Sequence, residues 1–449
     1  MKTRNLWMLL MAVVLLGFNS CKKETVDVTD LLKTVPSSAA GVVVINMEGI
    51  LEDAGCKIKD HVVTPSDEVK GLIEKSSSSM KDEYMLLFSG DTGIEPKGAV
   101  VFYDTNRTFL TVALYDVKKF CDYIEKKTGN SFTEESGGVK VCGQVAVKGS
   151  QAWVCMVSHK NIDADAISAY ASLGTSQSFL VTPIGEKLLV EEDDIRGWAM
   201  INTFANEMLS RQDRSMFSLG LGFLFEDAES VMFKTDFKKG ELEMEAVVLN
   251  DNGKPAKYLL PSDKVDVNTL KSLGASCDAM MAFTLNSKLI KKFEQLGSAF
   301  GGVLFGNLGD MFKNVDGTVG IVSSGNGVGE SINGVVSTKG EVSKSLKDLI
   351  SNEMGAVKED GKYLRFSKGD VKGSLSVEDC ANELKGCCLG FVLDPSGFQS
   401  VGYGDAAPSG LKNVVFKLNP ESGGLEVEID VKTTDPKENA LLTILRNSK

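Results

Sequence analysis

The chain has 449 residues, a formal net charge of −12 and 43% hydrophobic residues. This composition is typical of a globular protein with two or more domains. The acidic balance argues against nucleic-acid binding, because that requires clustered lysine and arginine side chains that displace counterions from phosphates. No motif in the sequence identifies a reaction.

The first twenty residues predict a secretory signal peptide. Lys2 and Arg4 precede an apolar stretch over 6–18, which is too short to cross a bilayer because a spanning helix needs about 20 apolar residues. The sequence Phe18-Asn19-Ser20-Cys21 then resembles a bacterial lipobox. Removal of residues 1–20 would change the formal charge from −12 to −14, because Lys2 and Arg4 leave with them.

A lipobox predicts that the thiol of Cys21 becomes linked to diacylglycerol and anchors the mature chain. A buried cysteine behind an ordinary signal peptide is the alternative. Two acyl chains make such an anchor effectively permanent, because each buried methylene adds roughly 0.8 kcal/mol. Residues 21–28 would form a short tether, so that the folded body lies close to the membrane.

The rest of the chain contains an internal duplication. The first pair of aligned segments includes the first predicted strand of the chain. Residues 31–46 align without gaps to 269–284, and residues 228–248 align without gaps to 411–431 with eight of twenty-one positions identical. We therefore expect a first α+β repeat over 29–250, a turn-rich linker over 251–264 and a second α+β repeat over 265–449.

Alternating apolar and polar residues predict β-hairpins, and apolar residues at helical spacing predict helices between them. The fold class expected is α+β, a tandem duplication of a unit in which antiparallel β-hairpins pack against helices. In chain order the predicted elements are hairpin arms 98–103 with 108–114, a helix over 116–129, arms 139–147 with 152–158, a hairpin over 228–248, arms 316–323 with 330–338, a helix over 342–355, a shorter pair 362–367 with 370–377, a hairpin over 411–431 and a helix over 435–447.

Residues that commonly carry chemistry are sparse. His61 and His159 are the two histidines, and neither has a second histidine or cysteine at zinc-ligand spacing. A Ser-His-Asp hydrolase lacks the G-x-S-x-G turn that would hold its serine. The acidic run 191–194 lacks the spacing of a calcium loop and predicts a solvated edge. We expect no metal and no cofactor.

Two apolar segments rich in glycine, 216–225 and 299–312, are the most distinctive candidates for a binding site. They would either form core helices or line an apolar groove for a ligand or an envelope protein. The side chains proposed for this groove are Phe217, Phe223, Phe225, Phe300 and Phe305.

Cysteine spacing shows no regular disulfide framework. Cys142 and Cys155 form the one plausible pair, because they lie on facing arms of a predicted hairpin. The alternative is that both are small core residues.

The lipobox at Cys21, the strand opening Pro36-Ser37-Ser38-Ala39 and the duplication together resemble a family of uncharacterised Bacteroidetes envelope lipoproteins, catalogued as domain of unknown function 4836. The resemblance implies outer-membrane anchoring and supplies no catalytic residues. We expect a lipid-anchored envelope protein that binds or scaffolds without catalysis, facing either the periplasm or the cell surface. The alternative is an envelope hydrolase that uses carboxylates in a cleft between the two halves.

Overall fold

The structure is a computed structural model. It describes residues 28–75, 78–104, 107–156, 162–190, 193–208, 214, 224–260, 263–287, 289–291, 294, 308–325, 331–395, 410–421 and 424–447.

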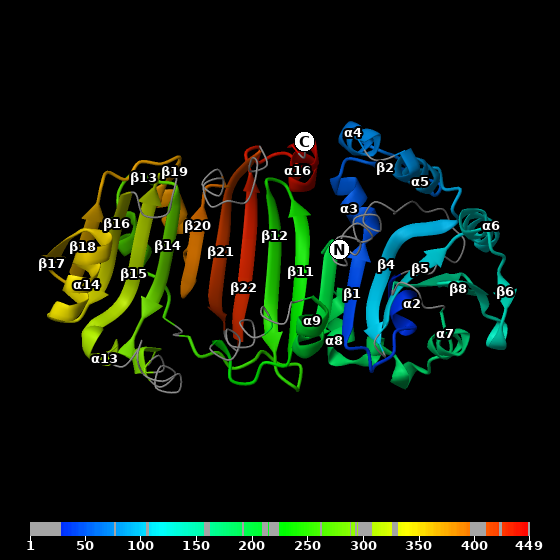
Figure 1. Ribbon diagram of the computed structural model, residues 1–449, viewed down its shortest axis with the longest axis horizontal. Helices are drawn as coiled ribbons and strands as arrows, with labels where there is room; N and C mark the ends of the chain where they lie inside the picture. The colour runs from blue at the N-terminus through cyan, green and yellow to red at the C-terminus, as the bar shows by residue number, and fades with distance from the viewer. Residues whose placement is uncertain are drawn as a thin grey trace.

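Its main feature is one long antiparallel sheet of 18 strands, which runs the length of the molecule (Figure 1). Helices pack on both of its faces and along its edges, so the predicted α+β class with antiparallel hairpins is confirmed. None of the helices in the described ranges is long and apolar enough to span a bilayer.

The first half of the chain supplies one end of the sheet. Its strands lie in the order β12-β11-β10-β1-β4-β5-β9-β8-β7-β6 from the centre outwards. Their bounds are β1 Gly41–Asn46, β4 Ile94–Asp104, β5 Arg107–Leu114, β6 Thr133–Glu134, β7 Lys140–Cys142, β8 Val145–Lys148, β9 Gln151–Cys155, β10 Ile195–Met200, β11 Ser230–Lys238 and β12 Glu241–Leu249.

The second half repeats that order as β22-β21-β20-β14-β15-β16-β18-β17. In each half the last hairpin, β11–β12 or β21–β22, therefore lies at the centre of the sheet. The first strand of that half in the main sheet, β1 or β14, lies three strands outward from β12 or β22. The bounds are β14 Ala279–Leu285, β15 Val315–Ser324, β16 Ser331–Thr338, β17 Ala356–Asp360, β18 Tyr363–Lys368, β20 Leu389–Leu393, β21 Leu411–Glu421 and β22 Gly424–Thr433.

Two small sheets lie outside the main one. They pair β2 Lys57–Lys59 with β3 Val62–Thr64, and β13 Ser276–Cys277 with β19 Leu375–Ser376.

The helices also follow the duplication. On one face of the sheet lie α2, α7 and α8 in the first half and α11 packed with α15 in the second; on the other face lie α6 and α14. Their bounds, with those of the remaining helices, are α2 Val28–Lys33, α3 Met47–Asp53, α4 Asp67–Lys75, α5 Ser78–Phe88, α6 Val117–Thr128, α7 Ala164–Tyr170, α8 Pro183–Val190, α9 Ile201–Met208, α11 Val267–Lys271, α13 Leu308–Met311, α14 Lys344–Met354, α15 Val377–Glu383 and α16 Ala440–Asn447.

Local sequence explains where α6 begins and ends. The Asp116 side chain accepts a hydrogen bond from the Lys119 N–H, and Gly129 ends the helix in the left-handed conformation with its N–H donating to the Glu125 carbonyl. Both are standard caps that satisfy backbone groups left free at helix ends. The predicted helix over 116–129 is therefore present in the structure.

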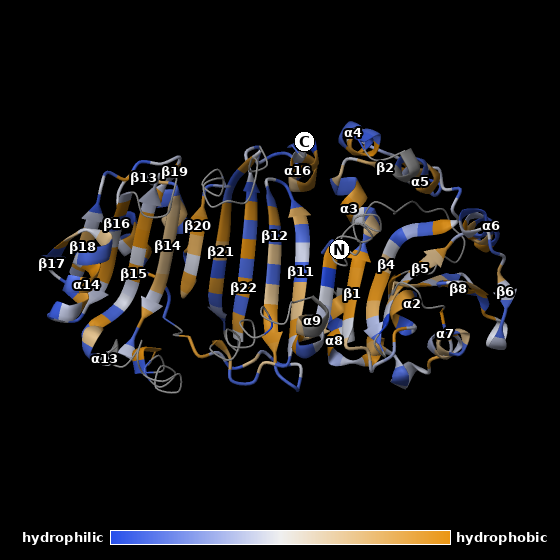
Figure 2. Cartoon of the chain, in the orientation of Figure 1, coloured by the Kyte–Doolittle hydropathy of each residue, from blue (hydrophilic) through white to orange (hydrophobic). Residues whose placement is uncertain are grey.

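The two halves join through their equivalent strands β12 and β22, which form an antiparallel pair. Glu245 lies directly opposite Glu428, and the two are equivalent positions of the repeat. An approximate two-fold axis therefore passes through this pair. Along the four central strands hydrophilic and hydrophobic residues alternate (Figure 2), so that one face of the junction is charged and the other is apolar.

Three local predictions were wrong. The last helix begins at Ala440 rather than 435, because Asp435 and Pro436 belong to the preceding turn. Residues 370–377 do not pair with β18, whose hairpin partner is β17 on its N-terminal side. The arms expected over 139–158 are three strands, with β8 lying between Cys142 on β7 and Cys155 on β9.

Candidate functional site

A pocket lies between α14 and the sheet of the second half. It has a volume of about 270 Å³, and eleven of its twelve lining side chains are apolar. The lining residues are Phe283, Leu285, Phe312, Val319, Ile321, Val336, Leu346, Leu349, Ile350, Glu353, Met354 and Phe366. An apolar lining with one polar group is typical of sites for small amphiphilic ligands.

One sheet position beside the pocket has no side chain. Gly334 on β16 lies between Ile321 on β15 and Phe366 on β18. A β-carbon at Gly334 would lie 1.9 Å from Cζ of the Phe366 ring. The ring of Phe366 therefore lies over the glycine, and it forms part of the pocket wall.

Apolar side chains at the pocket continue onto an exposed surface. Leu349 lines the pocket and is 46% exposed. On the same face of the sheet, Met281 lies directly opposite Ile321 in the pocket wall, and Phe391 lies opposite Met281. Met281 is 45% exposed and Phe391 38%, although large apolar side chains are usually buried. An apolar surface thus leads to the pocket.

The equivalent region of the first half is more extensively filled. There Phe120 and Ile124 of α6 are buried against Cys142 of β7 and Val145 of β8. Strands β6 and β7 extend that half beyond the strand that corresponds to β17, which ends the second half. The helix of the first half therefore packs on a strand, β7, that has no counterpart in the second half.

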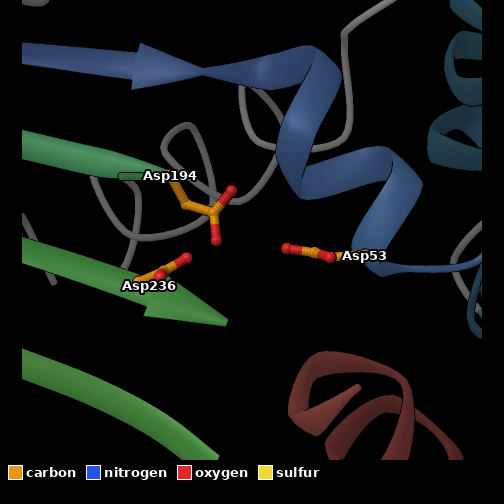
Figure 3. Close-up of side chains that lie close together, drawn as sticks. All are labelled: Asp53, Asp194 and Asp236. Atoms are coloured by element: carbon orange, nitrogen blue, oxygen red, sulfur yellow. The ribbon is translucent and has the colours of Figure 1, made fainter. Parts of the chain in front are cut away.

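A second feature is a cluster of three aspartates beside the interior strands β10 and β11. Asp53 at the end of α3, Asp194 just before β10 and Asp236 on β11 point toward one another (Figure 3), and one carboxylate oxygen of each lies within 4.8 Å of the others. Asp194 is 3% exposed, so the prediction of a solvated edge over 191–194 was wrong for this residue. The Phe237 N–H donates a hydrogen bond of 2.8 Å to Oδ2 of Asp194.

Burial sets the protonation of this cluster. It raises the pKa of Asp194 to about 8, with the neighbouring carboxylates adding to the effect, and it raises the pKa of Asp53 to about 6. Ionisation of all the carboxylates that share a site is unfavourable, because their negative charges repel one another. Three such oxygens are also ligands that hard cations accept, but nothing beyond the acidic cluster itself indicates a bound ion.

Carboxylates also gather where the two halves meet. Glu243, Glu428 and Asp430 lie together on the charged face of the junction. The Lys417 ammonium forms ion pairs with Glu428 and, at 3.2 Å, with the buried Asp430. Burial raises the pKa of Asp430 to about 6 against the opposing effect of Lys417. Two of these acids are thus paired with Lys417, and Glu243 is paired with Lys238, within a continuous sheet.

His61 is the histidine that falls within the described residues. It lies in the turn between β2 and β3, and its ring stacks on Tyr115 with centroids 3.9 Å apart. Its Nδ1 is 3.4 Å from Oε2 of Glu95, which is 1% exposed. Burial raises the pKa of Glu95 to about 7 and lowers that of His61. Sequence spacing gave no indication of this pair.

The proposed groove phenylalanines are only partly placed. Phe225 is buried in the core with Val248 and Leu418 and does not line the pocket beneath α14, which agrees with the core alternative for this residue. Phe217, Phe223, Phe300 and Phe305 lie outside the described residues, as do Cys21 and His159.

For Cys142 and Cys155 the structure agrees with the alternative that both are core residues. Cys142 and Cys155 are both free and belong to clusters on opposite faces of the sheet. The structure brings together a different pair, Cys277 on β13 and Cys380 on α15, whose thiols lie within hydrogen-bonding reach of each other. They are 103 residues apart in the sequence, so spacing could not identify them.

Comparison with known proteins gives little. The chain matches no protein-family model and no characterised protein sequence. Among solved structures it is similar to crystal form III of TP0453, with a TM-score of 0.32 and 10% identity, over 78% of this chain and 96% of that one. Crystal form I gives a TM-score of 0.30 and 10% identity, over 80% and 97% of the two chains. Similarity at this level assigns no function.

Proposed function

We propose that this chain is a lipid-anchored binding protein of the bacterial cell envelope, and that it holds the hydrocarbon chain of an amphiphilic molecule in the pocket beneath α14. The anchor at Cys21 and the placement at the outer membrane come from the lipobox and from the family resemblance. The binding activity comes from the pocket. Its apolar lining, open to an exposed apolar surface, is the observation that carries the proposal.

The expected affinity follows from hydrocarbon transfer. Each methylene moved out of water contributes about 0.8 kcal/mol. A pocket of 270 Å³ equals roughly nine water volumes at ~30 Å³ each, and a methylene is of similar size. About nine methylenes give roughly 7 kcal/mol before the cost of immobilising the ligand, so we expect a dissociation constant weaker than about 10 micromolar.

Catalysis at the junction between halves is less well supported. A hydrolase would need two carboxylates that are free to exchange protons with a bound substrate. Glu428 and Asp430 are both engaged by Lys417.

Binding of the neutral apolar fluorophore N-phenyl-1-naphthylamine tests the proposal. We expect saturable binding, weakened about fivefold or more by Leu349→Asp, which places a charge at the pocket without disturbing the buried core. Val181→Asp is the matched control, because Val181 is similarly exposed and lies outside the pocket.

Two results would refute the proposal. One is the absence of saturable binding to the wild-type chain. The other is an equal affinity of the wild-type chain and the Leu349→Asp variant.

A further inference from the structure

We infer that the molecule held in this pocket is a single-chain amphiphile with a cationic, ammonium-type head group, bound at the C-terminal end of α14. The inference rests on the proposed function and adds the chemical class of the ligand.

The charge of the pocket comes from one residue. Glu353 is the only ionisable side chain among the twelve that line it, and it is exposed. The other eleven are apolar and suit a hydrocarbon chain. A ligand that buries its chain among them would place its polar end next to the Glu353 carboxylate, where a cation is favoured over an anion.

The end of α14 provides a second source of negative charge. The last turn of a helix carries partial negative charge from unpaired carbonyl groups, which basic side chains commonly compensate. The last turn of α14 contains no basic residue and carries Glu353. Glu353 therefore lies where the helix itself favours a cation.

The corresponding helix of the first half shows the usual arrangement. The last turn of α6 contains Lys126 and Lys127, and its end is closed by the left-handed Gly129. In α14 the equivalent glycine, Gly355, has φ 101° and ψ −160° and forms no such cap. Of the two related helices, the one that borders the pocket is thus the one whose last turn carries no basic side chain.

Pocket size limits the ligand to one chain. The volume of 270 Å³ equals roughly nine water-sized groups. One unbranched chain of about that length fills it, and a second chain would have to remain outside.

Three probes with the same chain separate the head groups: decylamine, decanol and decanoate, each competing with N-phenyl-1-naphthylamine at pH 7. We expect decylamine to bind about fivefold to tenfold more tightly than decanol, and decanoate to bind more weakly than decanol. Glu353→Gln should abolish most of the preference for decylamine and leave decanol binding unchanged. Glu353→Lys should reverse the preference.

Asp348→Asn is the matched control, because Asp348 is an exposed acid on the same helix that does not line the pocket. If Asp348→Asn reduces the preference as much as Glu353→Gln, the preference comes from the general acidic charge and the inference is wrong. Equal binding of all three probes also overturns the inference but leaves the proposed function intact. Binding of none of them refutes the proposed function itself.

Discussion

Glu245 and Glu428 lie directly opposite each other across the β12–β22 pair, and they occupy the same position in the two copies of the repeat. Like charges at directly opposite positions destabilise a sheet. Each glutamate has its own lysine on the next strand outward, Lys234 at 2.9 Å from Glu245 and Lys417 beside Glu428. The junction is therefore a symmetric row of four charges, Lys-Glu-Glu-Lys.

Removal of one lysine from this row tests its contribution to stability. Lys417→Met leaves Glu428 and the buried Asp430 without their cation, so we expect the free energy of unfolding to fall by about 3 kcal/mol. The equivalent Lys234→Met should cost less, about 1 kcal/mol or below, because Lys234 is more exposed. Urea denaturation at pH 7 measures both, and equal losses would contradict the asymmetry.

The aspartate cluster predicts an unusual pH dependence. The unfolded chain releases the Asp194 proton near pH 3.8, whereas the folded chain holds it until about pH 8. Between these pH values the folded state thus binds more protons than the unfolded state. The contribution of Asp194 to the free energy of unfolding is therefore fully present below about pH 4 and is lost as the pH rises toward 8. Asn stays neutral and can still accept the Phe237 N–H, so we expect Asp194→Asn to be more stable than wild type at pH 8.5.

Each pKa unit corresponds to about 1.4 kcal/mol, so the shift of about four units makes the gain roughly 6 kcal/mol at pH 8.5 and only about 1 kcal/mol at pH 4.5. Urea denaturation at the two pH values measures it. Asp67→Asn serves as the control, since its carboxylate is exposed and its replacement should have the same small effect at both values. A wild-type stability that rises between pH 4.5 and 8.5, with no gain in the variant, would show that Asp194 ionises normally.

Local elements could be predicted from the sequence where one short pattern determines them. Asp116 and Gly129 mark the two ends of α6, and alternation through Leu242-Glu243-Met244-Glu245 identifies β12. The duplication was also visible, because the sequence of each copy has a glycine between the predicted arms of its last hairpin, Gly240 in the first copy and Gly423 in the second. These signals act over a few residues and do not depend on tertiary contacts.

The candidate sites could not be predicted, because each combines side chains from distant elements. Asp53, Asp194 and Asp236 come from a helix end, a loop and a strand. The pocket depends on which face of the sheet α14 covers, and on the meeting of Gly334 with Phe366 from the next strand of the sheet. Aromatic content drew attention to Phe225, but that residue is in the core.

The Cys277–Cys380 contact predicts a disulfide under oxidising conditions. The two buried thiols interact, which lowers the pKa of Cys277 and raises that of Cys380. We expect glutathione disulfide to accept two hydrogens from this pair, and the bond to add about 3 kcal/mol to the free energy of unfolding. Peptide mass spectrometry without reductant would identify the cross-link, and Cys277→Ser should remove it. Recovery of a Cys142–Cys155 cross-link instead would contradict the structure.

Gly334 links the sheet to the pocket, and its replacement should affect binding more than folding. A β-carbon at this position would overlap the Phe366 ring, so in Gly334→Ala the ring must move away from β16. Because Phe366 forms part of the pocket wall, we expect its movement to reduce the free volume and to weaken N-phenyl-1-naphthylamine binding at least tenfold. Phe366→Leu in the same chain removes the overlap and should restore part of the affinity. Gly71→Ala in α4, where a β-carbon meets no atom within 4 Å, should leave binding unchanged. If Gly334→Ala binds the fluorophore as the wild type does, the ring does not form the wall of the binding site, and the ligand lies elsewhere.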